Sequence, residues 1–209
     1  MKRQTKRCLA VLLALLTLFS CLSVGVSALN IGDTVRISGS KEWISGFYYD
    51  FSGSGLGTNK YGQHQYLHTE DGRPAYCIEP NEHFTDGTKT ILDSVDSLSQ
   101  DVRDKISFAE LYGYGGNGTK YGYSWETEYV ATWGIVWSLV LGHFDGAQEE
   151  VYLNHVFGGK TSAENRANAK AVYAKIKEQI LSHRTVPSFT TRDFNRAHEK
   201  KITLPFLRP

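Results

Sequence analysis

The chain has 209 residues, of which 23 are Lys or Arg and 22 are Asp or Glu, and 41% are hydrophobic. This length suits one domain with a sizeable core, and the plentiful aromatic residues with only five prolines indicate a globular fold. The near-balance of charge argues against a nucleic-acid partner, which needs a concentrated basic face.

The first 28 residues have the three parts of a secretory signal peptide. Residues 1–7 carry four cations and no acid, residues 9–19 are a short apolar run, and Val26 and Ala28 suit a cleavage site. We expect cleavage after Ala28, which leaves 19 basic against 22 acidic residues and no membrane span. The alternatives are lipid attachment at Cys21 and a retained anchor over residues 9–26.

Cleavage would leave one cysteine, Cys77, because Cys8 and Cys21 lie in the signal peptide. A single cysteine cannot form an internal disulfide. It is a free reactive thiol, an intermolecular partner or an inert buried side chain, and the count alone favours burial.

The first half of the chain has the composition of β-structure. Alternating and aromatic-rich stretches predict strands, residues 52–59 read as a loop, and Asp71-Gly72 is a turn signal for a hairpin. On this prediction Cys77 lies on the second strand of the hairpin, which Pro80 limits. The expected strands are 34–38, 43–49, 63–69 and 73–79.

The second half predicts helices. Ser99 can cap a helix that runs to about Tyr112, and residues 125–141 are apolar nearly all round, which is typical of a buried helix. A short helix is expected over 146–157. A capping box over 161–164 opens a last helix that ends near His183, and an extended segment follows from Val186. The sequence therefore predicts an α+β domain, with a sandwich-like or barrel-like β-rich N-terminal half packed against buried C-terminal helices.

Two motifs resemble ligand sites but have simpler interpretations. The glycines over 113–118 follow a helix, whereas a nucleotide-binding loop follows a strand and opens a helix. His64 and His68 would share one face of a strand, where they are better explained as polar strand groups than as metal ligands. We therefore expect no metal and no cofactor.

Glu79 is two residues from Cys77 and would point to the same face of the predicted strand. We interpret it as a solvated or capped carboxylate. A cysteine nucleophile paired with His83 or His143 is a separate hypothesis, because such pairs form in space and not along the sequence.

Three stretches carry a family resemblance. Tyr76-Cys77-Ile78-Glu79-Pro80, the glycine turn over 111–116, and the helix Ala131-Thr132-Trp133-Gly134-Ile135-Val136-Trp137 followed by residues 140–142 are similar to the thioester (TQXA) domains of Gram-positive surface adhesins. The order and spacing of the three stretches fit, and the similarity covers about residues 30–195.

The resemblance implies a specific chemistry. In the family the cysteine thiol is joined to a glutamine side chain with loss of ammonia, and an amine on a host surface then attacks this internal thioester. Here Trp133 stands at the glutamine position, and an indole has no carboxamide. Cys77 would therefore be a free thiol, and Tyr76, Glu79, Thr132 and Trp137 are the candidate binding residues. We hypothesise that Gly134 makes room for the indole.

The sequence thus predicts a signal peptide (1–28), a thioester-type adhesin domain (29–195) and a truncated tail (196–209) with no cell-wall sorting signal. We expect a secreted or surface domain of a Gram-positive bacterium that binds a host or matrix protein without a covalent bond and is not an enzyme. The alternatives are a secreted cysteine-dependent hydrolase that uses Cys77 and an inert structural remnant.

Overall fold

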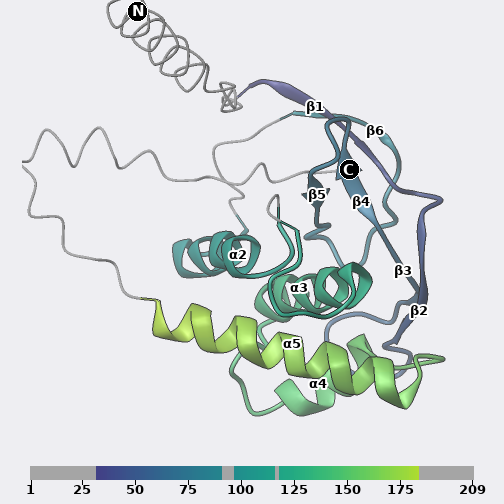
Figure 1. Ribbon diagram of the computed structural model, residues 1–209, viewed down its shortest axis with the longest axis vertical. Coiled ribbons are helices and arrows are strands. Elements are labelled where there is room, and N and C mark those ends of the chain that lie inside the picture. Colours follow the sequence, from purple (N-terminus) through teal and green to yellow (C-terminus); the bar gives the residue numbers. More distant parts are fainter. Residues whose placement is uncertain (1–31, 91–96, 116–117, 184–209) are drawn as a thin grey trace, which may run out of the picture. The chain divides into compact units, whose positions relative to one another are not determined.

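The computed structural model describes residues 32–90, 97–115 and 118–183 (Figure 1). The expected signal peptide, the segment from Val186 and the tail over 196–209 lie outside these residues. Within the described part, no helix combines the length and the apolar character that a membrane span requires.

The N-terminal half forms two antiparallel sheets. The larger sheet has the strand order β5-β4-β1-β6, and the smaller one pairs β2 with β3. Ile37 of β1, Leu67 of β4 and Ala75 of β5 point inward and form a small apolar cluster under the larger sheet. The strands are β1 (Thr34–Ser38), β2 (Trp43–Asp50), β3 (Tyr61–Gln65), β4 (Leu67–Thr69), β5 (Pro74–Ala75) and β6 (Gly87–Thr90).

The expected strand over 63–69 is two strands in two different sheets. The break falls at Tyr66, whose backbone N–H donates to the Glu42 carbonyl at 2.8 Å. The ring of Tyr66 packs edge-on against Trp125 and Tyr129 at the start of the buried helix, with centroid distances of 5.0 Å to each. His64 and His68 consequently lie in separate sheets, and the expectation that they share a face is wrong.

The expected hairpin exists, but its second strand ends at Ala75, so Cys77 does not lie on a strand. β4 and β5 pair through Leu67 with Ala75 and through His68 with Pro74. The carbonyls of Ala75 and Cys77 are instead bound by side chains of a helix, as described below, and no strand ladder continues.

The C-terminal half consists of helices, as expected for an α+β fold. They are α2 (Gln100–Tyr112), α3 (Trp125–Val140), α4 (Glu149–Val156) and α5 (Ala163–Ser182). Ser99 caps α2 as expected, and its hydroxyl accepts from the Val102 N–H. The α5 cap is Ser162 rather than Thr161. The Thr161 hydroxyl instead accepts from the Tyr48 N–H at 2.7 Å and donates to the Tyr48 carbonyl at 3.0 Å, which ties the start of α5 to β2.

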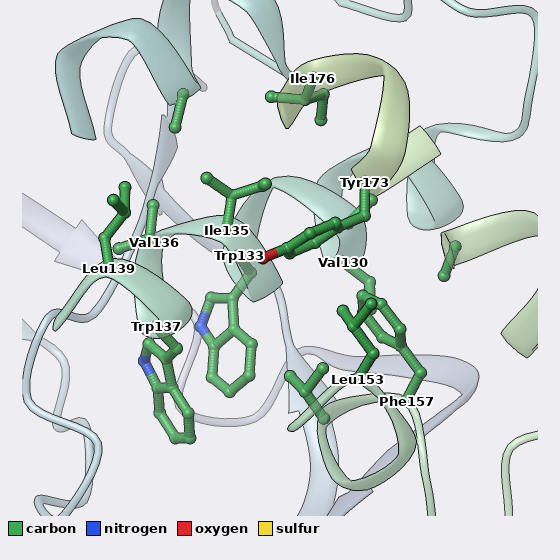
Figure 2. Packing of buried hydrophobic residues seen from close by; sticks show 14 of the residues in the cluster. Val130, Trp133, Ile135, Val136, Trp137, Leu139, Leu153, Phe157, Tyr173 and Ile176 are labelled. Carbon is green, nitrogen blue, oxygen red and sulfur yellow. The ribbon is translucent and has the colours of Figure 1, made fainter. Parts of the chain in front are cut away.

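Helix α3 is the centre of the main core. Every residue from Thr127 to Leu139 is buried, which confirms the prediction of a buried helix. Figure 2 shows side chains of α3 meeting those of α4 and α5.

The packing around Gly134 leaves no room for a side chain. A Cβ atom at this position would lie 2.8 Å from Cζ of Phe157 and 3.7 Å from Cδ2 of Tyr173. The Gly134 carbonyl also accepts from the Tyr152 hydroxyl at 2.7 Å. Glycine at this position therefore admits the Phe157 ring, and the hypothesis that it also makes room for the indole stays a prediction.

Candidate functional site

One face of α3 binds the backbone of the cysteine segment. The Tyr129 hydroxyl donates to the Ala75 carbonyl at 2.9 Å and accepts from the Leu67 N–H at 3.1 Å. Two turns further along the same face, Nε1 of Trp137 donates to the Cys77 carbonyl at 2.9 Å. Residues four apart lie one above the other on a helix, so position 133 falls on this face between the two anchors. The fold thus brings together the cysteine segment and the helix that carry two stretches of the resemblance.

The Trp133 side chain packs against three aromatic rings. Its ring centroid lies 3.8 Å from that of Trp137, 4.5 Å from that of His64 and 5.7 Å from that of Tyr49. The residue is only 6% exposed. Figure 2 shows its indole beside that of Trp137. These contacts make the indole part of the core, because aromatic rings this close contribute both buried area and favourable ring geometry.

Cys77 is half-buried and its thiol donates to the Glu79 carbonyl, with 3.6 Å between Sγ and O. Burial is the main cause that raises the pKa of this thiol, and the Glu79 and Glu82 carboxylates raise it further. The hydrogen bond to Glu79 and the Lys89 ammonium act in the opposite direction, but the net shift is upward. The thiol is therefore protonated at neutral pH, which makes it a weak nucleophile.

Tyr76 and Thr132 both anchor the glycine turn that follows α2. The Tyr76 hydroxyl donates to the Tyr114 carbonyl, and its ring stacks on Tyr129 with a centroid distance of 5.0 Å. Thr132 accepts from the Tyr114 N–H at 2.8 Å, and its hydroxyl donates to the Glu128 carbonyl at 2.7 Å. A Cβ at Gly113 would lie 2.3 Å from the Thr132 hydroxyl oxygen, so glycine is needed there. These contacts connect the three stretches of the family resemblance.

Glu79 does not share a strand face with Cys77, because the chain is irregular there. Its Oε2 atom is buried and has no hydrogen-bond partner among the described residues, which differs from the expected solvated or capped carboxylate. A buried carboxylate oxygen without a partner is energetically costly.

The side chains of His64, His68 and His143 form hydrogen bonds with groups other than the Cys77 thiol. The fully buried His64 ring donates from Nε2 to the Val156 carbonyl at 2.9 Å, and burial lowers its pKa to about 4, so it is neutral at pH 7. His68 pairs with Glu42, whose hydrogen bond raises its pKa. His143 donates from Nε2 to the Leu56 carbonyl at 3.1 Å. No histidine in the described ranges is hydrogen-bonded to the Cys77 thiol, and no described group of three acidic, His or Cys side chains is arranged to hold a metal ion.

Three of the glutamine side chains outside α3 donate to other groups. Gln63 donates to the Ile44 carbonyl at 2.8 Å, Gln65 to the Ser40 carbonyl at 2.7 Å, and Gln100 to the Asp104 carboxylate at 2.5 Å.

Sequence reasoning did not identify the two residues that enclose Trp133 from the sheet side, Tyr49 and His64. Alternation along β2 and β3 marks both as inward-facing, but nothing in the pattern shows that the two strands pair over α3.

Comparison with known proteins agrees with this geometry. The family model for the thioester domain (TED) matches residues 74–182, and the chain belongs to this family. No curated protein matches the sequence.

Two solved structures resemble the fold. The Bacillus anthracis TIE protein matches with a TM-score of 0.50 and 13% sequence identity over 75% of this chain and 25% of that chain. The thioester domain of the Enterococcus faecium TIE86 protein matches with a TM-score of 0.48 and 13% identity over 77% of this chain and 54% of that chain. This chain therefore spans between a quarter and about half of the proteins it matches.

Proposed function

We propose that this domain is a bacterial surface adhesion domain that has lost the internal thioester and binds a host or matrix protein by non-covalent contacts. The observation that carries the proposal is the packing of Trp133, whose indole stands at the family's glutamine position within a closed aromatic cluster.

The loss follows from the chemistry of the bond. A thioester needs a carboxamide carbon within contact of the thiol and a site that excludes water. Position 133 has no carboxamide, and the Gln63, Gln65 and Gln100 side chains are bound to other groups. Gln148 lies outside α3, at the N-cap of α4, and the thiol is protonated. An adhesin of this kind would have no acyl group to transfer and no turnover.

An aromatic surface beside the cysteine segment supports a protein ligand. Trp125 is partly exposed, and its ring lies 5.0 Å from that of Tyr66 and 6.2 Å from that of Tyr114. Exposed Trp and Tyr side chains are the residues most enriched at protein–protein interfaces. The surface of a Gram-positive cell, reached by secretion, is the setting that we propose for this contact.

The proposal is tested by binding the fluorescently labelled mature chain (residues 29–209) to a layer of extracellular matrix and washing with detergent. We expect a bound signal that survives buffer but is removed completely by sodium dodecyl sulfate. The Cys77→Ser variant should bind equally well, and Trp125→Ala should bind more weakly.

Two outcomes would overturn the proposal in different ways. An adduct that survives the detergent and disappears in Cys77→Ser would show that covalent attachment persists. The absence of any binding above that of an unrelated protein would favour the inert remnant.

A further inference from the structure

The loop between β2 and β3 lines a cavity that the proposed function does not use. The cavity has a volume of about 490 Å³, which is within the range of pockets for small ligands. Its walls come from this loop and from one residue of the segment that follows Cys77, and none of them is aromatic, aliphatic or acidic. The residues that line it are Gly55, Gly57, Thr58, Asn59, Lys60 and Asn81.

The walls of the cavity are held in place by the protein itself. The Asn81 amide donates to the Gly57 carbonyl at 3.3 Å, and the Thr58 hydroxyl donates to the Pro80 carbonyl at 3.4 Å. The Leu56 side chain, in the middle of the loop, is buried in the main core. A ligand therefore meets a preformed site, which lowers the ordering cost of binding.

Three side chains on the walls keep polar groups available for a ligand. The Lys60 ammonium and the whole Asn59 amide have no hydrogen-bond or ion-pair partner among the described residues. Asn81 uses its NH₂ group on Gly57, which leaves its oxygen free to accept. The cavity thus offers one cation, one amide donor and two amide acceptors. A matching ligand carries a negative charge for Lys60 and supplies donors for the two amide oxygens.

This set of groups distinguishes between ligand classes. A protein partner is anchored mainly by aromatic and other large side chains in desolvated pockets, and the polar walls offer no apolar surface for such an anchor. A sulfate or phosphate ion alone would leave both amide oxygens without a donor. A sugar ring supplies several hydroxyl donors, and an acidic sugar supplies the negative charge as well.

We propose that the cavity formed by residues 55–60 and Asn81 binds an acidic sugar unit of an extracellular polysaccharide. The negative group of the sugar, a carboxylate or a sulfate ester, lies against Lys60, and ring hydroxyls donate to Asn59 and Asn81. The inference goes beyond the proposed function, because the ligand is not a protein and the aromatic surface around Trp125 does not line the cavity.

The test is the binding of short fluorescent oligosaccharides to the mature chain (residues 29–209), measured by fluorescence anisotropy. One probe is a hyaluronan oligosaccharide, which carries carboxylates only, and the other is a chondroitin sulfate oligosaccharide, which also carries sulfate esters. We expect saturable binding of at least one of them. The affinity should fall as salt is raised, because the ion pair with Lys60 is partly exposed and is screened. A neutral maltose oligosaccharide of the same length should bind much more weakly.

Three variants locate the binding. Lys60→Gln removes the charge, and we expect about tenfold weaker binding of the acidic probe. Asn59→Ala removes one amide and should weaken binding by about threefold to tenfold. Lys41→Gln makes the same change of charge at an exposed lysine outside the cavity and should bind like the unmodified chain. Thermal unfolding midpoints close to that of the unmodified chain would show that all three variants keep the fold.

The two acidic probes also identify the negative group. Binding of hyaluronan shows that a carboxylate suffices, whereas binding of chondroitin sulfate alone assigns the sulfate ester, and either result supports the proposal. It would be overturned by the absence of saturable binding of both probes, by unchanged affinity in Lys60→Gln, or by tighter binding of polyglutamate than of either oligosaccharide. Since the oligosaccharides contain no protein, this result and that of the test with Trp125→Ala can fail separately.

Discussion

The two apolar clusters of this domain differ in how they surround Trp133 and Cys77. The main core, centred on α3, encloses Trp133 with aromatic rings and leaves it almost no exposed surface. The cluster under the larger sheet has only three buried residues, and Cys77 lies at its margin, half-exposed.

This difference shows how a reactive pair can be separated without loss of the fold. In the function proposed above, a large side chain that packs in the main core, Trp133, stands in place of the acyl half of the family's site. The thiol half remains, held by backbone hydrogen bonds to Tyr129 and Trp137 that do not depend on the reaction. The segment keeps its place because the anchors of α3 bind its carbonyls and not its sulfur.

The difference between the two clusters is tested most strongly by truncating Trp133 and Cys77 in separate variants. Trp133→Ala should lower the free energy of unfolding by about 3–5 kcal/mol, because it removes a buried indole and leaves a cavity. Cys77→Ala should cost about 1 kcal/mol or less, since its side chain is small and partly exposed. Urea denaturation of both variants measures this. Trp43→Ala, at a position that is 55% exposed, is the matched control for loss of an indole from the surface and should be close to neutral. Equal losses at positions 133 and 77 would contradict the comparison.

Acid should weaken the aromatic cluster through His64. Its folded-state pKa, about 4, lies below the unfolded value of about 6.5, so the unfolded chain binds the proton first. The stabilising contribution is complete above pH 6.5 and is lost as the pH falls toward 4. Between pH 7 and pH 4.5 this amounts to about 2–3 kcal/mol. The urea midpoint at each pH measures it.

Two variants separate this effect from other titrations. His64→Gln keeps a donor for the Val156 carbonyl but no titratable group, so its stability should vary less with pH in this range. His68→Gln removes an opposite contribution, because the raised pKa of His68 stabilises the fold at low pH, so its acid sensitivity should increase slightly. If His64→Gln kept the full pH dependence of the unmodified protein, the assignment to His64 would be wrong.

Gly134→Ala should lower stability by about 1–3 kcal/mol, because the new methyl group must displace the Phe157 ring. Thermal unfolding measures the loss. Gly134→Ala combined with Phe157→Leu should recover part of it if the contact with Phe157 is the cause. A helix-interior glycine with free space around it would instead gain stability on substitution by alanine.

The smallest expected effect concerns the anchor of the cysteine segment. Trp137→Phe keeps an aromatic ring but removes the donor to the Cys77 carbonyl, and we expect a loss of about 1 kcal/mol. The same variant should make Cys77 react faster with iodoacetamide, because the segment opens more readily. An unchanged alkylation rate would show that the hydrogen bond does not hold the segment.

The sequence predicted the helices well because their signals are local. The all-round apolar character of residues 125–141 and the Ser99 cap are readable along the chain, and the structure confirms both. The break at Tyr66 was not predictable in this way, since alternation continues through it and the change of sheet depends on contacts with α3.

The candidate site was predictable only in part. Motif spacing paired Cys77 with position 133, and the fold brings their elements together. The burial of Trp133 against Tyr49 and His64 depends on which strands face α3 and each other, and so does the burial of Glu79 Oε2 without a partner among the described residues. These are properties of tertiary packing, which residue patterns do not encode locally.

The measurement that tests the central claim most directly is the intact mass of the purified mature chain before and after incubation with methylamine. We predict a mass equal to that of the plain sequence, no change with methylamine, and full alkylation of Cys77 once the chain is unfolded. A mass lower by one ammonia that increases on amine treatment would contradict the account, since it would show that a thioester forms in spite of Trp133.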